Sequence, residues 1–161
     1  MTAAPGGSTE RIAALTLDER SVLRRSPQIE HERAVAVTDL LKDNRFAPVS
    51  GLAGPYRLHL AVEENRLTMA VSGSNGDGEN IVLPLFPFRR IVKDYFLVCE
   101  SYYEAIRSRR LGQVEAIDVG RRSLHDEGSA LLIERLAGKV AIDHDTARRL
   151  FTLICVLHLR A

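Results

Sequence analysis

Residues 142–158 read IDHDTARRLFTLICVLH, and this stretch predicts a capped helix in the middle of the hydrophobic core. Asp143 can accept hydrogen bonds from the free amides of the first turn, and Asp145 places negative charge at the positive end of the helix dipole. Apolar residues then recur at helical spacing and, from Leu150 onward, cover almost every side of the helix. We therefore expect this helix to have neighbours on several faces. A helix of about fifteen residues is too short to cross a bilayer.

The length and net charge of the chain predict a single domain that does not bind a highly charged partner. A length of 161 residues suits one hydrophobic core, and 22 basic against 21 acidic residues give a net charge of +1. Such a balance creates no overall field that would attract nucleic acid or a membrane. Residues 1–9 are predicted to form a flexible tail, and residues 10–161 a single α+β domain. The tail lacks the pattern of a secretory signal, so the predicted location is cytoplasmic.

The cysteines are predicted to be structural. Cys99 and Cys155 both lie within apolar helical patterns, where a free thiol commonly packs as a small hydrophobic group. Cys155 and His158 have the spacing of a metal-ligand pair, but any further ligands would have to come from elsewhere in the chain. A core thiol beside a helix-terminal histidine is the simpler interpretation. The sequence thus indicates no disulfide framework, no metal site and no cofactor.

The first half of the chain has the signals of a small sheet. Apolar and polar residues alternate over 56–62 and again over 67–71, which predicts a β-hairpin. An antiparallel sheet covered on one face is the expected result. The other predicted segments of this half are a strand over 11–17, a helix over 28–41, a loop over 46–55, a turn over 72–78 and a strand over 80–85.

The second half is predicted to be helical. Periodicity indicates helices over 88–106 and 113–136, followed by a short extended link over 140–142 and the final helix. Gly120 and Gly128 interrupt the second of these helices, which is either continuous or kinked, and the glycines mark either a hinge or close packing. The predicted strands lie mostly in the first half of the chain and the predicted helices in the second half, and this order favours the α+β class. We expect a small antiparallel sheet of three or four strands packed against a C-terminal set of helices.

The densest polar cluster lies within residues 115–129. If this segment is continuous helix, Asp118, Arg121, Arg122 and His125 are three or four residues apart and share a face. A carboxylate, guanidinium groups and an imidazole brought together could bind an anionic ligand or carry out acid–base chemistry. The same spacing also fits a network of intrahelical ion pairs and helix caps, and it matches no known catalytic signature.

A family resemblance is carried by five stretches: IEHERA at 29–34, VKDYF at 92–96, ESYYEAI at 100–106, and the segments 115–129 and 142–158. Together they resemble a family of small alphaproteobacterial proteins known as the uncharacterised protein family UPF0262. The resemblance extends over residues 11–158 and implies a bacterial cytoplasmic protein. It implies no activity, cofactor or catalytic residue, so no functional role carries over to positions of this chain.

These observations favour a non-enzymatic binding or regulatory module for a partner protein or a small anionic ligand. Arg121, Arg122 and Arg148 are the candidate ligand-binding residues, and the apolar helices are compatible with a homo-oligomer. The alternative is a hydrolase or transferase acting on an anionic substrate, with His125 as acid or base and Asp118 orienting it. Arginine pairs near aromatic residues would suit RNA, but these aromatics fit the core better and nearby acids offset the charge, which argues against nucleic acid.

Overall fold

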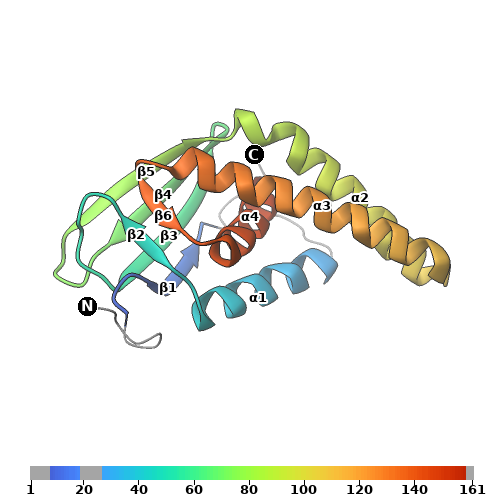
Figure 1. Ribbon diagram of the computed structural model, residues 1–161, viewed down its shortest axis with the longest axis horizontal. Coiled ribbons are helices and arrows are strands. Elements are labelled where there is room, and N and C mark those ends of the chain that lie inside the picture. Colours follow the sequence, from blue (N-terminus) through green and yellow to red (C-terminus); the bar gives the residue numbers. More distant parts are fainter. Residues whose placement is uncertain (1–7, 19–26, 159–161) are drawn as a thin grey trace.

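The computed structural model describes residues 8–18 and 27–158 and confirms the predicted α+β class (Figure 1). Apart from Ser8 and Thr9, the predicted flexible tail lies outside the described residues, so that prediction stays open. The elements, in chain order and with η2 denoting a 3-10 turn, are β1 (Ile12–Leu17), α1 (Pro27–Lys42), β2 (Phe46–Pro48), β3 (Tyr56–Glu63), β4 (Arg66–Ser72), β5 (Gly78–Pro84), η2 (Phe86–Phe88), α2 (Arg89–Arg107), α3 (Leu111–Leu136), β6 (Val140–Ile142) and α4 (His144–His158).

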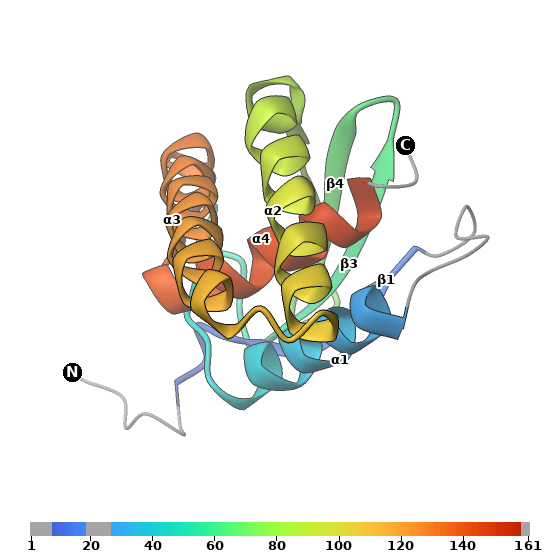
Figure 2. The same cartoon turned by 90° about the vertical axis from the view of Figure 1, so that its right-hand side faces the viewer.

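Helix α4 is the centre of the core, as its sequence predicts. Oδ1 of Asp143 accepts a hydrogen bond from the Thr146 amide at 2.9 Å, which caps the first turn. Every residue from Leu150 to Leu157 is buried. The helix packs against α1, α3 and β3, and it crosses behind α2 and α3 in Figure 2. In the described part of the chain, no helix combines the length and apolar character that a membrane span requires.

The main sheet has the strand order β1-β3-β4-β5 and is mixed rather than wholly antiparallel. The hairpin β3–β4 and its neighbour β5 are antiparallel, as predicted, and Tyr56, Leu58 and Leu60 of β3 are buried while Arg57 and His59 are exposed. The prediction of an antiparallel sheet is wrong for β1, which pairs with β3 in parallel. The chain returns to the sheet through α1 between these two strands, and such a crossover brings the next strand back in the same direction.

A second, two-stranded sheet occupies part of the predicted loop over 46–55. Residues Phe46–Pro48 form β2, which pairs antiparallel with Val140–Ile142 of β6. Phe46 and Pro48 are buried, so their side chains belong to the core despite the turn-forming composition of the segment. A strand of three residues is too short to show alternation of apolar and polar side chains. Its partner strand also lies far along the chain, so the sequence gives no local signal for this pairing.

Asn44 fixes the C-terminal end of α1 against β1. Its Oδ1 accepts a hydrogen bond from the Ile12 amide at 2.7 Å, while its Nδ2 donates to the Ile12 carbonyl at 3.0 Å and to the Leu40 carbonyl at 2.8 Å. The Asn44 amide therefore caps α1 and also binds both main-chain groups of a strand residue. These bonds anchor the C-terminal end of α1 to β1.

Helix α3 is one continuous helix, and its two glycines have different environments. A Cβ atom at Gly128 would overlap the ring of Phe151 on α4, so the absence of a side chain lets the two helices approach closely. Gly120 has no neighbouring atom within 4 Å of the same position. Gly128 is thus a close-packing position, and the helix continues through both glycines.

The Gly128→Ala substitution should destabilise the protein by about 1–3 kcal/mol, because the added methyl group forces Phe151 and α4 to shift. The Gly120→Ala substitution is the matched control in the same helix and should stabilise the protein by about 0.5–1 kcal/mol through helix propensity. Urea unfolding followed by circular dichroism measures both free energies. Equal effects of the two substitutions would contradict the packing role of Gly128.

Candidate functional site

Asp118, Arg121 and Arg122, predicted to share a face of α3, form an intrahelical ion-pair network. Arg121 donates to Oδ1 of Asp118 from Nε at 3.1 Å and from Nη2 at 2.6 Å, while Nε of Arg122 lies 3.2 Å from Oδ2. The guanidinium of Arg121 also stacks 4.8 Å from the ring centroid of Tyr102. Burial alone would lower the pKa of Arg121, but the hydrogen bonds and charge of Asp118 raise it overall. The carboxylate is therefore shared between two guanidinium groups.

His125, the fourth predicted residue, is bonded to α4 instead of Asp118. Its Nε2 lies 2.8 Å from Oγ1 of Thr152, and that hydroxyl donates its proton to the Arg148 carbonyl at 3.2 Å. The hydroxyl has no second proton, so it must accept from an Nε2–H group on His125. This assigns the Nε2–H tautomer and leaves Nδ1 as an acceptor. Among the described residues, Nδ1 of His125 is the one buried side-chain nitrogen or oxygen without a hydrogen-bond partner.

The imidazole of His125 is kept neutral by its surroundings. It lies between the rings of Tyr95 and Phe151, with ring centroids 5.5 Å away in both cases. Burial lowers the pKa of His125 from 6.5 to about 4, and the charge of Arg148 adds to this effect while Asp126 opposes it. At neutral pH the side chain is uncharged.

A cleft of about 290 Å³ between α1 and α4 has His125 at its border. Arg148, the remaining predicted candidate, also lines this cleft, whereas Arg121 and Arg122 do not. The structure thus separates the predicted cluster into two groups. The lining residues are Glu32, Val35, Ala36 and Asp39 from α1, His125 from α3, and Asp145, Arg148, Arg149 and Thr152 from α4.

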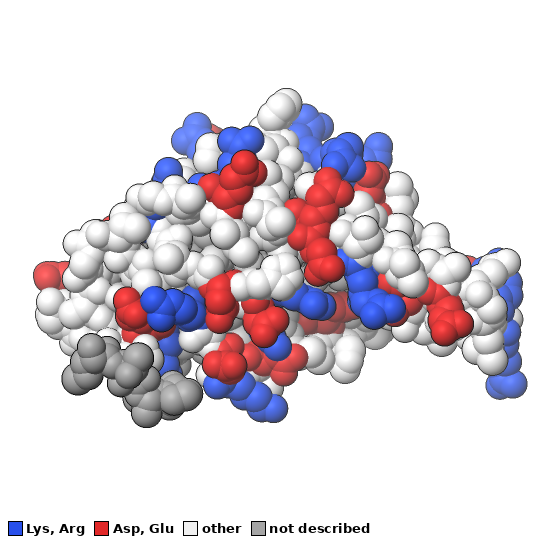
Figure 3. All heavy atoms as spheres, viewed as in Figure 1, with Lys and Arg blue, Asp and Glu red and all other residues white. Residues whose placement is uncertain are grey.

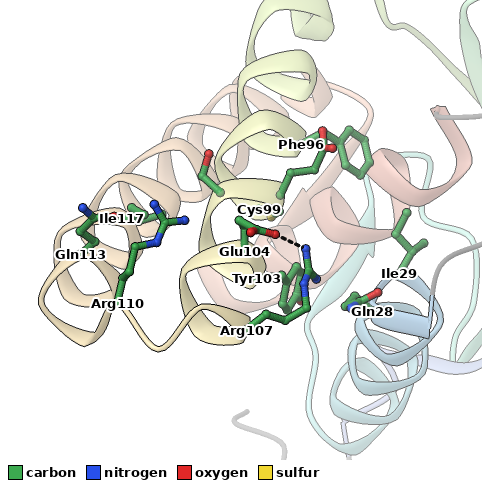
Figure 4. A pocket seen from close by; sticks show the side chains of 12 residues that line it. Gln28, Ile29, Phe96, Cys99, Tyr103, Glu104, Arg107, Arg110, Gln113 and Ile117 are labelled. Atoms are coloured by element: carbon green, nitrogen blue, oxygen red, sulfur yellow. Dashed lines mark hydrogen bonds and ion pairs between the residues drawn. The ribbon is translucent and has the colours of Figure 1, made fainter.

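A larger groove, of about 820 Å³, lies between α1 and the α2–α3 pair (Figure 4). Both α1 and α3 pack on α4, but α1 makes few contacts with α2, so the space between them stays open. The rim is formed by exposed polar side chains and the floor by half-buried or buried apolar ones. The lining residues are Gln28 and Ile29 of α1, Phe96, Cys99, Glu100, Ser101, Tyr103, Glu104 and Arg107 of α2, Arg110, and Gln113 and Ile117 of α3.

The groove continues inward into a small apolar recess of about 30 Å³. Its walls include Tyr95, Phe96 and Cys99 of α2 and Cys155 and Val156 of α4. Both cysteines are free and buried, as predicted. Burial raises the pKa of Cys99 to about 11 and raises that of Cys155 as well, so both thiols are protonated and behave as apolar lining.

A hydrogen bond between Tyr103 and Glu32 joins α2 to α1 at the edge of the groove. Oη of Tyr103 donates to Oε1 of Glu32 at 2.8 Å. Burial, and then the bond to Glu32, raise the pKa of Tyr103. Tyr103 lines the groove and the recess, while Glu32 lines the recess and the α1–α4 cleft. This bond therefore stands between the groove and the cleft.

The groove is the feature that sequence reasoning missed, because its walls come from segments about seventy residues apart in the chain. A signal was nevertheless present, since the stretches 29–34 and 100–106, which carry the family resemblance, both contribute to the groove. In contrast, the two ends of α4 form no joint site. His158 binds Asn65 at 3.2 Å, and no group of three potential ligands within residues 8–18 and 27–158 could hold a metal ion.

Comparison with known sequences gives a family match over nearly the whole chain. The sequence model of the uncharacterised protein family UPF0262 matches residues 9–160. A UPF0262 protein of Rhodospirillum rubrum is 58% identical over 153 residues, which cover 94% of each chain. One from Rhodopseudomonas palustris is 57% identical over 98% of this chain and 97% of the relative. One from Rhizobium johnstonii is 53% identical over 93% and 96%, respectively. No solved structure matches the chain at a significant level.

The lowered pKa of His125 predicts a loss of stability in mild acid. The unfolded chain binds a proton at His125 below about pH 6.5, whereas the folded protein binds it only near pH 4. The stabilisation is therefore complete above pH 6.5 and is lost as the pH falls through this window. We expect the free energy of unfolding to decrease by about 2–3 kcal/mol from this group.

Urea titrations of the wild type and of His125→Gln across this pH range measure the effect. The glutamine can still donate to Thr152 but does not titrate. The free energy of unfolding of the variant should therefore change less with pH than that of the wild type. Identical slopes would show that His125 does not cause the acid sensitivity.

Proposed function

We propose that this chain, which belongs to the uncharacterised protein family UPF0262, is a binding module for a segment of a partner protein. The family resemblance predicted from the sequence is confirmed, and the family brings no activity of its own. The observation that carries the proposal is the groove between α1 and the α2–α3 pair, with its exposed polar rim and apolar floor. Grooves between helices commonly accept an amphipathic segment whose apolar face lies against the floor.

The charges of the groove favour a protein segment over a small anion. Nη2 of Arg107 is bound to Glu104 at 2.7 Å, so one of the two arginines that line the groove is already neutralised. Glu100 adds negative charge to the same rim. Figure 3 shows basic and acidic side chains interspersed over the face it displays. A small anion would find no concentrated positive charge here, whereas a longer segment can match charges of both signs.

The recess supplies the specificity that such a segment would need. It opens from the groove beside Cys99 and Tyr103, and most of its lining side chains are apolar. Its volume of about 30 Å³ suits the methyl end of one aliphatic side chain, and the neighbouring residues of the segment would then lie along the rim. An apolar anchor in a desolvated site surrounded by polar contacts is the usual energetic pattern of a protein interface.

The enzyme alternative, a hydrolase or transferase acting at Asp118, Arg121 and His125, receives less support. Arg121 and Arg122 occupy the carboxylate of Asp118, and His125 is oriented by Thr152. A histidine with a pKa of about 4 is a weak base at neutral pH. These features fit a structural network better than a set of groups poised for proton transfer, so we rank binding first.

We also propose a cytoplasmic location, in keeping with two free, buried cysteines, which suit a reducing compartment. A second copy of the chain is one candidate partner, and self-association would then be part of the function. Exposed apolar side chains on α2 and at the start of α3, namely Leu97, Ile106 and Leu111, support a surface that contacts protein.

Selection from a displayed library of random twelve-residue peptides tests the proposal with the purified chain. Selected peptides should contain an apolar anchor and should bind at least about tenfold more weakly to the Ile117→Glu variant, because the new carboxylate places charge in the groove. Val119→Glu is the matched control, since Val119 is 60% exposed on the same helix and does not line the groove.

Fluorescence anisotropy measures the affinities, circular dichroism checks that both variants are folded, and sedimentation velocity reports self-association. Peptides that bind the Ile117→Glu and Val119→Glu variants equally well would contradict a role for the groove. Failure to select any binding peptide, together with a monomer in solution, would count against the binding module as a whole.

A further inference from the structure

Side chains of opposite charge line the cleft between α1 and α4 without pairing across it. Glu32 and Asp39 come from α1, and Arg148 and Arg149 come from α4. No ion pair joins the two helices across the cleft within the described residues. Unlike charges that line one cavity and stay more than ion-pair distance apart leave room for a group that bridges them.

Each of these side chains keeps the capacity to bind another group. Arg148 has only a long contact of 4.0 Å to Asp126, which does not line the cleft, and Arg149 donates to the main-chain carbonyl of Asp145 at 3.0 Å. Glu32 uses one oxygen to accept from Tyr103. Asp39 has no side-chain hydrogen bond or ion pair to any described residue.

The size and the neutral residues of the cleft indicate a small ligand. A volume of about 290 Å³ is near the lower limit for small-molecule sites and too small for a protein segment. Val35 and Ala36 provide a short apolar surface beside the charges. His125 is uncharged at neutral pH, and the hydroxyl of Thr152 is occupied, so these two residues do not alter the charge balance.

We propose that the α1–α4 cleft binds a small zwitterion of the α-amino acid class, with its ammonium at Asp39 and its carboxylate at Arg148. A simple anion would be repelled by three carboxylates in the lining, those of Glu32, Asp39 and Asp145, and a simple cation by the two guanidinium groups. A zwitterion makes a charge-assisted hydrogen bond at each end, and an arginine matches a carboxylate in a bidentate manner.

This site is separate from the proposed function. The cleft lies beyond the hydrogen bond between Tyr103 and Glu32, and Asp39 and Arg148 do not line the groove. The groove can therefore bind a protein segment whether or not the cleft binds a zwitterion.

Titration of the ¹⁵N-labelled full chain with each of the twenty proteinogenic amino acids, followed by NMR, tests the proposal. We expect saturable shifts at amides of α1 and α4 with at least one amino acid. For the tightest of these, two matched analogues follow: the carboxylic acid that lacks the ammonium and the amine that lacks the carboxylate. Each analogue should bind at least about tenfold more weakly, because one end of the zwitterion is missing.

Charge-only variants locate the site. Asp39→Asn and Arg148→Gln should each weaken binding at least about tenfold. Asp126→Asn is the matched control, since it removes a carboxylate next to Arg148 but outside the cleft. The affinity of this variant for the amino acid should equal or exceed that of the wild type. Thermal unfolding confirms that each variant is folded.

Three results would overturn the inference: no amino acid binds; the analogue without an ammonium binds as tightly as the amino acid, which would indicate an anion site; or Asp39→Asn and Asp126→Asn have the same effect. Isothermal titration calorimetry with the selected amino acid provides an independent measurement of the affinities.

Discussion

The structure depends on covering α4 on all sides. From Leu150 to Leu157 every residue of this helix is buried, so no face of it can be left to water. Helix α1 covers one side, α3 another and β3 a third. Helix α3 can approach closely because Gly128 has no side chain where the ring of Phe151 lies. The sheet and the outer helices are thus arranged by what one apolar helix requires.

The same arrangement leaves the groove open beside α1. Because α1 and the α2–α3 pair pack against α4 and make few contacts with each other, their facing sides remain partly open to solvent. Asn44 holds one end of α1 on β1, and the bond between Tyr103 and Glu32 joins α1 to α2. The groove and the α1–α4 cleft lie on opposite sides of that bond and differ in chemistry. The groove has an apolar floor, whereas the cleft is lined largely by charged side chains. A protein segment and a small zwitterion are the ligands that we propose for the groove and the cleft, respectively.

The polar residues of α3 show how burial divides a cluster that looks uniform in sequence. Asp118 and Arg121 are held together on the half-buried face of the helix, where mutual neutralisation offsets the loss of solvation. One turn further on, His125 enters an aromatic environment between Tyr95 and Phe151, where an uncharged imidazole is favoured. Residues that share a helical face can thus have different electrostatic roles when the elements packed above them differ.

The sequence by itself determined the elements whose signals are local. Helical periodicity and the Asp143 cap predicted α4, and strict alternation predicted the β3–β4 hairpin, because both patterns depend on residues a few positions apart. Only the tertiary structure decided that β1 runs parallel to β3, that Phe46–Pro48 pairs with Val140–Ile142, and that α1 faces α2 across a groove. It also decided that His125 binds Thr152 rather than Asp118. These features join segments distant in the chain, and such contacts leave no periodic trace in a single sequence.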